Sequence, residues 1–153
     1  MRPQLPTLRS PLTVMQLASE MGRLYDIEKL TFFRACECYE ELEAAGKLDA
    51  DALIFVNSIA SVSLNDEDWA HFRAAHKAIL SKLVVEITEE EEMNERELER
   101  KRNVPGSSGV FALDDYGSGY SNGNSLLTIA PKYVKVDIAI IPVSYTHLRA
   151  HET

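Results

Sequence analysis

Four short apolar runs, rich in Val, Ile and Phe, constrain the fold of this chain more than any other feature. Runs of this kind are typical of strands buried on both faces of a parallel sheet. The runs are residues 52–56, 83–87, 110–113 and 133–136. Each run carries or meets polar residues near its end, which is where α/β folds build their sites. These residues are Asn57, Glu86, Asp114, Asp115 and Lys135.

Helical patterns separate the four runs. We expect helices over residues 13–22, 26–45, 65–80 and 126–129. Asp26 is expected to cap the second helix and Gly46 to end it. The apolar face of this helix is expected to consist of Ile27, Leu30, Phe33, either Cys36 or Ala35, Tyr39 and Leu42. The alternation of strand and helix predicts an α/β fold with parallel strands and right-handed crossover helices.

Residues 89–102 interrupt this regular pattern. They are densely charged and offer only Met93 and Leu98 to a core. A helix that is polar on nearly all sides gains little from packing, so we expect a short, solvated helix here.

Composition narrows the classes of function. The 153 residues carry a net charge of −8, which argues against a DNA- or RNA-binding surface. No run approaches the roughly 18 apolar residues that a membrane helix needs, so the chain is expected to be cytoplasmic. Cys36 and Cys38 are the only cysteines, and two helical residues at this spacing do not face each other. They are therefore expected to be reduced packing residues.

The residues at the strand ends suggest metal chemistry. Amide and carboxylate oxygens are hard ligands suited to Mg²⁺ or Mn²⁺, and the ammonium of Lys135 could handle a proton or stabilise charge. Bound cations would also let an acidic chain hold a small anion. Simpler alternatives remain open: Asn57 as a turn residue, Glu86 on the surface, a solvated acidic pair, and a structural ion pair between Lys135 and Asp114 or Asp115.

Four motifs, in order, resemble those of the EAL domain family of cyclic di-GMP phosphodiesterases. They are Phe-Val-Asn at 55–57, Val-Glu-Ile-Thr-Glu at 85–89, Leu-Asp-Asp-Tyr-Gly-Ser-Gly-Tyr-Ser at 113–121 and Val-Lys-Val-Asp at 134–137. The resemblance implies a partial TIM-like (β/α) barrel. It also implies hydrolysis of cyclic di-GMP to linear pGpG with Mg²⁺ or Mn²⁺, at a two-metal site in the complete domain.

The resemblance also implies a role for each matching residue. Asn57, Glu86 and Asp114 would be metal ligands. Asp115 would bind a second metal and would also be a catalytic residue. Lys135 would position or activate the attacking water. Asp114 and Asp115 can reach one centre only where the strand ends, because successive side chains of a strand point to opposite faces.

Two further roles follow from the resemblance. Glu89 would hold the loop after the aspartate pair in its working shape. Arg2 would match the arginine that helps to hold the substrate phosphate. The Glu-Ala-Leu motif itself is absent, and we expect it to lie upstream of Met1.

The resemblance extends to about residue 141. We expect residues 1–141 to form a partial EAL domain and residues 142–153 to be an unrelated, artefactual tail. The chain would then be a fragment of a phosphodiesterase, inactive alone because it lacks one upstream ligand and one downstream catalytic carboxylate. The alternative is a non-catalytic cyclic di-GMP-binding or interaction module, and family members often pair, which allows a homodimer.

Overall fold

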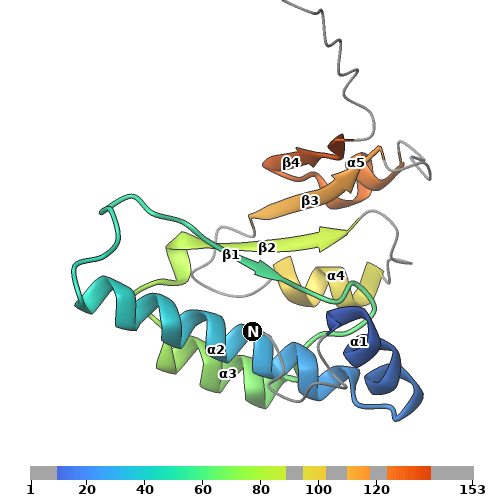
Figure 1. The fold of residues 1–153 in the computed structure, drawn as a ribbon, viewed down its shortest axis with the longest axis horizontal. Helices are drawn as coiled ribbons and strands as arrows, with labels where there is room; N and C mark the ends of the chain where they lie inside the picture. Colours follow the sequence, from blue (N-terminus) through green and yellow to red (C-terminus); the bar gives the residue numbers. More distant parts are fainter. Residues whose placement is uncertain (1–9, 89–94, 103–109, 118–123, 139–153) are drawn as a thin grey trace, which may run out of the picture.

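The computed structural model describes residues 10–88, 95–102, 110–117 and 124–138, and it contains helices on one side of a small sheet (Figure 1). The helices are α1 (Pro11–Glu20), α2 (Leu24–Ala44), α3 (Asp66–Ala75), the 3-10 helix η2 (Leu80–Lys82), α4 (Glu95–Arg102) and α5 (Asn124–Ile129). The strands are β1 (Ile54–Asn57), β2 (Leu83–Thr88), β3 (Phe111–Tyr116) and β4 (Tyr133–Val136).

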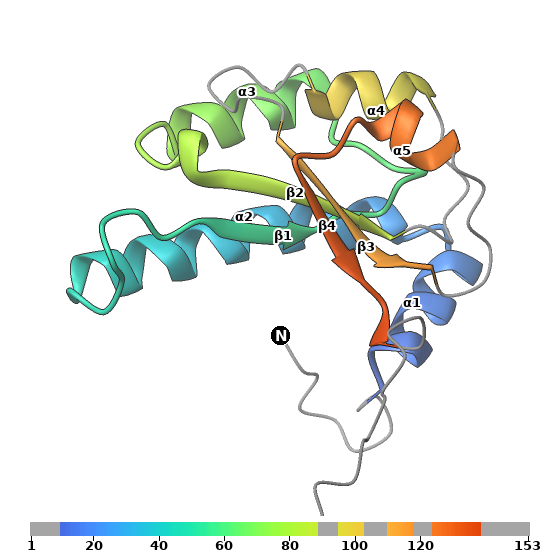
Figure 2. The same ribbon diagram turned by 90° about the horizontal axis from the view of Figure 1, so that it is seen from above.

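The four strands form one parallel sheet in the order β1-β2-β3-β4. A helix follows each of the first three strands, as right-handed crossovers require. Because the strand order never reverses, the crossovers place α3 and α4 on the same side as α2, as Figure 1 shows. Figure 2 shows the strong twist of β3 and β4 against β1. This arrangement is that of a partial (β/α) barrel and confirms the predicted α/β fold class.

The two faces of the sheet differ in what covers them. One face packs on the helices and supplies Ile54, Val56, Leu83, Val85, Ile87, Phe111 and Leu113 to the core. Strand residues at intermediate positions point the other way, because successive side chains alternate between faces. We call this second side the open face, and it carries Phe55, Asn57, Val84, Glu86, Thr88, Ala112 and Asp114.

Helix α2 differs from the sequence-based prediction at its start and in its buried stripe. It begins at Leu24, and Asp26 lies in its first turn, where it pairs with Arg23 instead of capping the helix. The residues that α2 buries are Glu28, Phe32, Cys36 and Tyr39, of which Cys36 and Tyr39 belong to the expected apolar face. Leu30 is 49% exposed, so its predicted burial was wrong. Phe32 decides the orientation, because its ring makes edge contacts with Trp69 and Phe72 of α3.

Cys36 packs in the core as predicted, whereas the predicted packing role of Cys38 was wrong. Cys36 is buried and Cys38 is exposed, and both are free thiols. Burial raises the pKa of the Cys36 thiol to about 12, with a smaller contribution from nearby Glu40. Cys36 is therefore a protonated packing residue.

Asn65 caps α3 as predicted, because its side-chain oxygen accepts a hydrogen bond from the backbone N–H of Asp68 at 2.8 Å. We expect Asn65→Ala to lower the free energy of unfolding by about 1 kcal/mol, since that N–H loses its partner. Urea denaturation would measure the change. Asn65→Asp is the matched control and should retain most of the stability. Equal midpoints for Asn65→Ala and the parent chain would contradict the capping role.

Within the described residues, no helix is both long and apolar enough to cross a membrane.

Candidate active site at the carboxyl ends of the strands

Predicted site residues from all four strands lie together on the open face. Asn57 ends β1 and is the register partner of Glu86 on β2, while Thr88 of β2 is the partner of Asp114 on β3. Lys135 lies on β4 next to Val134, which pairs with Leu113 of the core face. Register partners in a parallel sheet point to the same side, so these polar side chains share one edge of one face.

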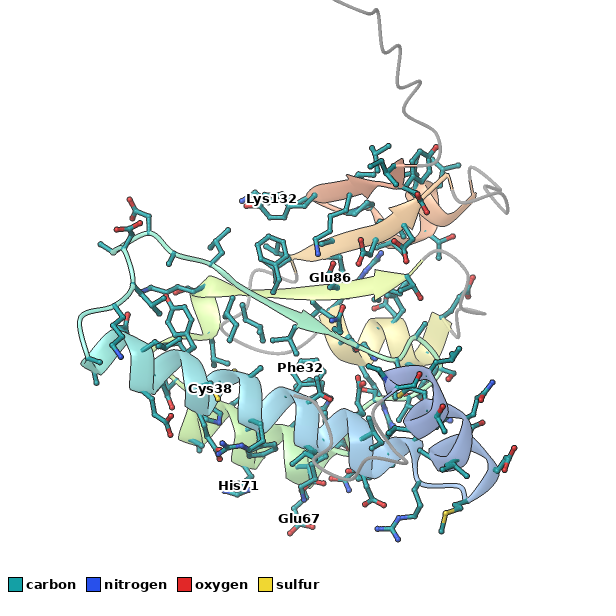
Figure 3. The ribbon with its side chains drawn as sticks, in the orientation of Figure 1. Phe32, Cys38, Glu67, His71, Glu86 and Lys132 are labelled. Atoms are coloured by element: carbon teal, nitrogen blue, oxygen red, sulfur yellow. The ribbon has the colours of Figure 1, made fainter. Side chains whose placement is uncertain are left out.

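Glu86, Lys135 and Asp114 form the centre of the site. The Lys135 ammonium donates a hydrogen bond to Glu86 Oε1 and lies 3.9 Å from Asp114 Oδ2. Glu86 is only 4% exposed, whereas the Lys135 side chain is 47% exposed. The register partner of Glu86 on β3 is Ala112, whose small side chain leaves room for Lys135 to reach across. Figure 3 shows Glu86 at the sheet, away from Phe32 on the helix side.

The geometry agrees in part with the alternative that Lys135 forms a structural ion pair with an aspartate. Lys135 pairs with Glu86 and lies within ion-pair distance of Asp114. Its main partner, Glu86, was not among the partners that the sequence suggested.

The environment of Glu86 raises the pKa of its carboxyl group above the ordinary value. Burial raises the pKa of the Glu86 carboxyl, the hydrogen bond from Lys135 lowers it, and a hydrogen bond with Asp114 raises it again. The net shift of the pKa is upward. Holding a buried carboxylate beside a second carboxylate is costly unless a cation lies next to them. A bound metal ion supplies such a cation.

The aspartate pair lies where β3 departs from regular geometry. The register between β3 and β4 shifts between Leu113 and Tyr116, and Asp115 takes a left-handed backbone with φ of 55°. Gly117 also has a positive φ, of 94°. The backbone N–H of Asp115 donates to Asp114 Oδ1 at 3.0 Å. The strand therefore bends at the aspartate pair, as both aspartates would need in order to serve one centre.

Aromatic side chains line the open face next to the ion pair. The rings of Phe55 on β1 and Tyr133 on β4 meet edge to face with centroids 5.5 Å apart. The Lys135 ammonium lies 5.6 Å from the centroid of Phe55. Strands β1 and β4 are not neighbours in the sheet, so this contact shows that the sheet curves and makes the open face concave.

The oxygen donors of the site are of the type that a hard divalent cation prefers. Asn57 offers an amide oxygen, and Glu86 and Asp114 offer carboxylates from adjacent strands. Among the residues that the structure describes, no three His, Cys, Asp or Glu side chains gather closely enough to hold a metal ion. Glu89 and Arg2, the other two predicted site residues, lie outside the described ranges.

Sequence reasoning missed a buried polar cluster behind the strand ends. The segment predicted as a solvated helix is α4, yet it buries Leu98 and Lys101, and Lys101 is 0% exposed. Lys101 pairs with Glu28 of α2 at 2.7 Å. The one available signal was that Leu98 and Lys101 lie three residues apart, on the same side of a helix.

Comparisons with known proteins agree with the fold and with the motifs. The family model for the EAL domain matches residues 1–150. The probable cyclic di-GMP phosphodiesterase PdeG of Escherichia coli (strain K12) is 27% identical over 137 residues, which cover 86% of this chain and 27% of that protein. The solved structure of the PaMucR phosphodiesterase in complex with c-di-GMP aligns with a TM-score of 0.65 and 23% identity.

The alignment with the solved structure covers 86% of this chain and 58% of that chain. This chain therefore spans about a quarter of the curated relative and little more than half of the solved one. The likeness to the solved structure concerns the fold, while the family model also covers the four motifs from which the site was predicted. The chain belongs to the EAL domain family.

Proposed function

We propose that this chain supplies part of the metal and substrate site of a cyclic di-GMP phosphodiesterase. The observation that carries the proposal is the nearly buried carboxylate of Glu86, held beside Asp114 and Lys135 on the open face of a curved parallel sheet. Membership of the EAL family and the similarity to PdeG support cyclic di-GMP as the substrate.

In this proposal Asn57, Glu86 and Asp114 hold one Mg²⁺ or Mn²⁺, and Asp115 serves a second. Such cations act as Lewis acids toward a phosphodiester. The left-handed backbone of Asp115 turns its carboxylate away from the regular strand path, so that both members of the pair can serve one site. The shape of the concave open face suits a planar ligand, because Phe55 and Tyr133 offer ring surfaces next to the polar centre.

Lys135 acts in its charged form in this proposal. An ammonium only donates hydrogen bonds, so it can orient an attacking water or stabilise negative charge on the phosphate. Its ion-pair contacts with Glu86 and Asp114 direct its position. Arg2 would hold a substrate phosphate, Glu89 would shape the loop after the aspartate pair, and the product would be linear pGpG.

A non-catalytic cyclic di-GMP-binding module is the second candidate. The observation that favours it is that the Lys135 ammonium already occupies the Glu86 carboxylate, and that fewer than three acidic, His or Cys ligands converge in the described ranges. We therefore propose that the 153-residue chain alone turns over little or no substrate.

Titration of the 153-residue chain with Mn²⁺, followed by electron paramagnetic resonance of the free ion, tests the site. We expect saturable binding, and we expect Glu86→Gln to raise the dissociation constant at least about tenfold, because a neutral amide is a weaker ligand. Asp51→Asn is the matched control, because Asp51 is exposed and precedes the amino end of β1, whereas Asn57 is at its carboxyl end. Equal Mn²⁺ affinity of the parent chain and Glu86→Gln would remove Glu86 from the site.

A further inference from the structure

A buried ion pair joins α2 to α4 directly behind the strand ends. Lys101 Nζ lies 2.7 Å from Glu28 Oε1, and the two side chains are 0% and 1% exposed. Lys101 also donates to Ser58 Oγ and, at 2.6 Å, to the carbonyl of Ile59. The three hydrogens of the ammonium therefore have three acceptors, on two different segments of the chain.

Glu28 binds the same two residues through both of its carboxylate oxygens. Its Oε1 accepts from Ser58 Oγ at 2.7 Å, and its Oε2 accepts from the backbone N–H of Ile59 at 2.8 Å. Together Glu28 and Lys101 bind the Ser58 hydroxyl and the backbone N–H of Ile59, and Lys101 shares the Ile59 carbonyl with the backbone N–H of Val62. The pair thus fixes one short piece of chain from two helices.

That piece of chain begins immediately after Asn57, the last residue of β1. The backbone N–H of Ser58 donates to the carbonyl of Glu86 at 2.9 Å, so Ser58 continues the ladder between β1 and β2. Ser58 is held by Glu86 on one side and by the buried pair on the other. Asn57 lies next to it, on the open face.

We propose that Glu28 and Lys101 are positioning residues that hold the end of β1 so that the Asn57 amide stands beside Glu86. This proposal rests on the proposed function, because it assigns the buried pair to the same site. A need for stability alone would not select such a pair, since apolar side chains of similar volume commonly replace a buried ion pair at no cost. Apolar side chains could not satisfy Ser58 and Ile59.

The test variant is the double substitution Glu28→Gln with Lys101→Met, which removes both charges at nearly constant volume. The matched control is Glu43→Gln with Lys82→Met, an ion pair whose Nζ–Oε1 distance is also 2.7 Å. Lys82 immediately precedes the amino end of β2, far along the sheet from the candidate site. In the test variant, amide hydrogen exchange at Ser58 and Ile59 should be at least about tenfold faster, with Val85 unchanged. The control should leave all three amides unchanged.

The second readout is Mn²⁺ affinity of the full 153-residue chain. The test variant should raise the dissociation constant about 10- to 100-fold, the range typical of partners that orient metal ligands, while the control should not. Unchanged affinity in a folded test variant, or equal acceleration of exchange at Ser58 and Val85, would overturn the positioning role. If the double variant does not fold, Lys101→Arg replaces it, because a planar guanidinium keeps the charge but not the three-way geometry.

The two readouts separate the two proposals. If the parent chain binds no Mn²⁺, the proposed function fails, and exchange at Ser58 and Ile59 alone decides whether the pair holds the strand end. Faster exchange confined to these two amides would then support the positioning role, and unchanged exchange would overturn it.

Discussion

Asp114→Asn should lower metal-dependent cleavage of cyclic di-GMP at least about a hundredfold in a completed domain, because loss of a direct ligand should exceed the 10- to 100-fold cost of losing an outer partner. The completed domain is a chimera in which this chain replaces the matching 137-residue segment of the E. coli relative. Formation of pGpG with Mg²⁺ or Mn²⁺, and its loss on chelation with EDTA, would be followed by chromatography.

The parent chimera must first show metal-dependent cleavage, which itself tests the proposed function. Asp51→Asn, at the opposite end of the sheet, is the control that should keep the parent rate. Since Asp114 is partly exposed, with 27% of its side chain accessible, the asparagine should not disturb folding, and circular dichroism would check this. Full turnover in folded Asp114→Asn would eliminate the ligand role.

Lys101→Met alone should destabilise the chain by about 3–5 kcal/mol, the range found when one member of a buried ion pair is removed. Glu28 would remain 1% exposed with no cation beside it, and the Ile59 carbonyl would keep only the backbone N–H of Val62 as a donor. Chemical denaturation of the single variant would measure the loss.

The double variant with Glu28→Gln provides the comparison. Because it removes the stranded charge, it should recover most of the stability lost in Lys101→Met, which gives a positive coupling energy between the two positions. Equal stability of Lys101→Met and the parent chain would show that Glu28 finds another partner, and would refute the account of the buried pair.

Much of the fold could be predicted because the relevant signals are local. Apolar runs with polar ends identify the strands. Their alternation with helical patterns predicts that the strands are parallel. Once β1, β2 and β3 are parallel, Asn57, Glu86 and Asp114 must share an edge, so the members of the candidate site followed from strand ends. Gly46, with φ of 64°, ended α2 as its sequence position predicted.

The remainder depended on contacts between distant residues. Glu28 and Lys101 are 73 positions apart, and neither stands out in a segment rich in charge. The buried stripe of α2 differs from the predicted one because Phe32 packs against Trp69 and Phe72 of α3. The apolar pattern of one helix does not reveal such partners on another. The pairing of Lys135 with Glu86 likewise required the small side chain of Ala112 at the centre of the open face.

The left-handed backbone at Asp115 limits how this position can change over evolution. Asparagine and glycine tolerate a φ of 55° about as well as aspartate does, whereas β-branched and bulky residues are strained there. A change of one nucleotide in the codon converts aspartate to asparagine and removes the charge without altering the path of the chain. Under the proposed function, such a change would remove the carboxylate of Asp115 from the site and leave the backbone of β3 as it is.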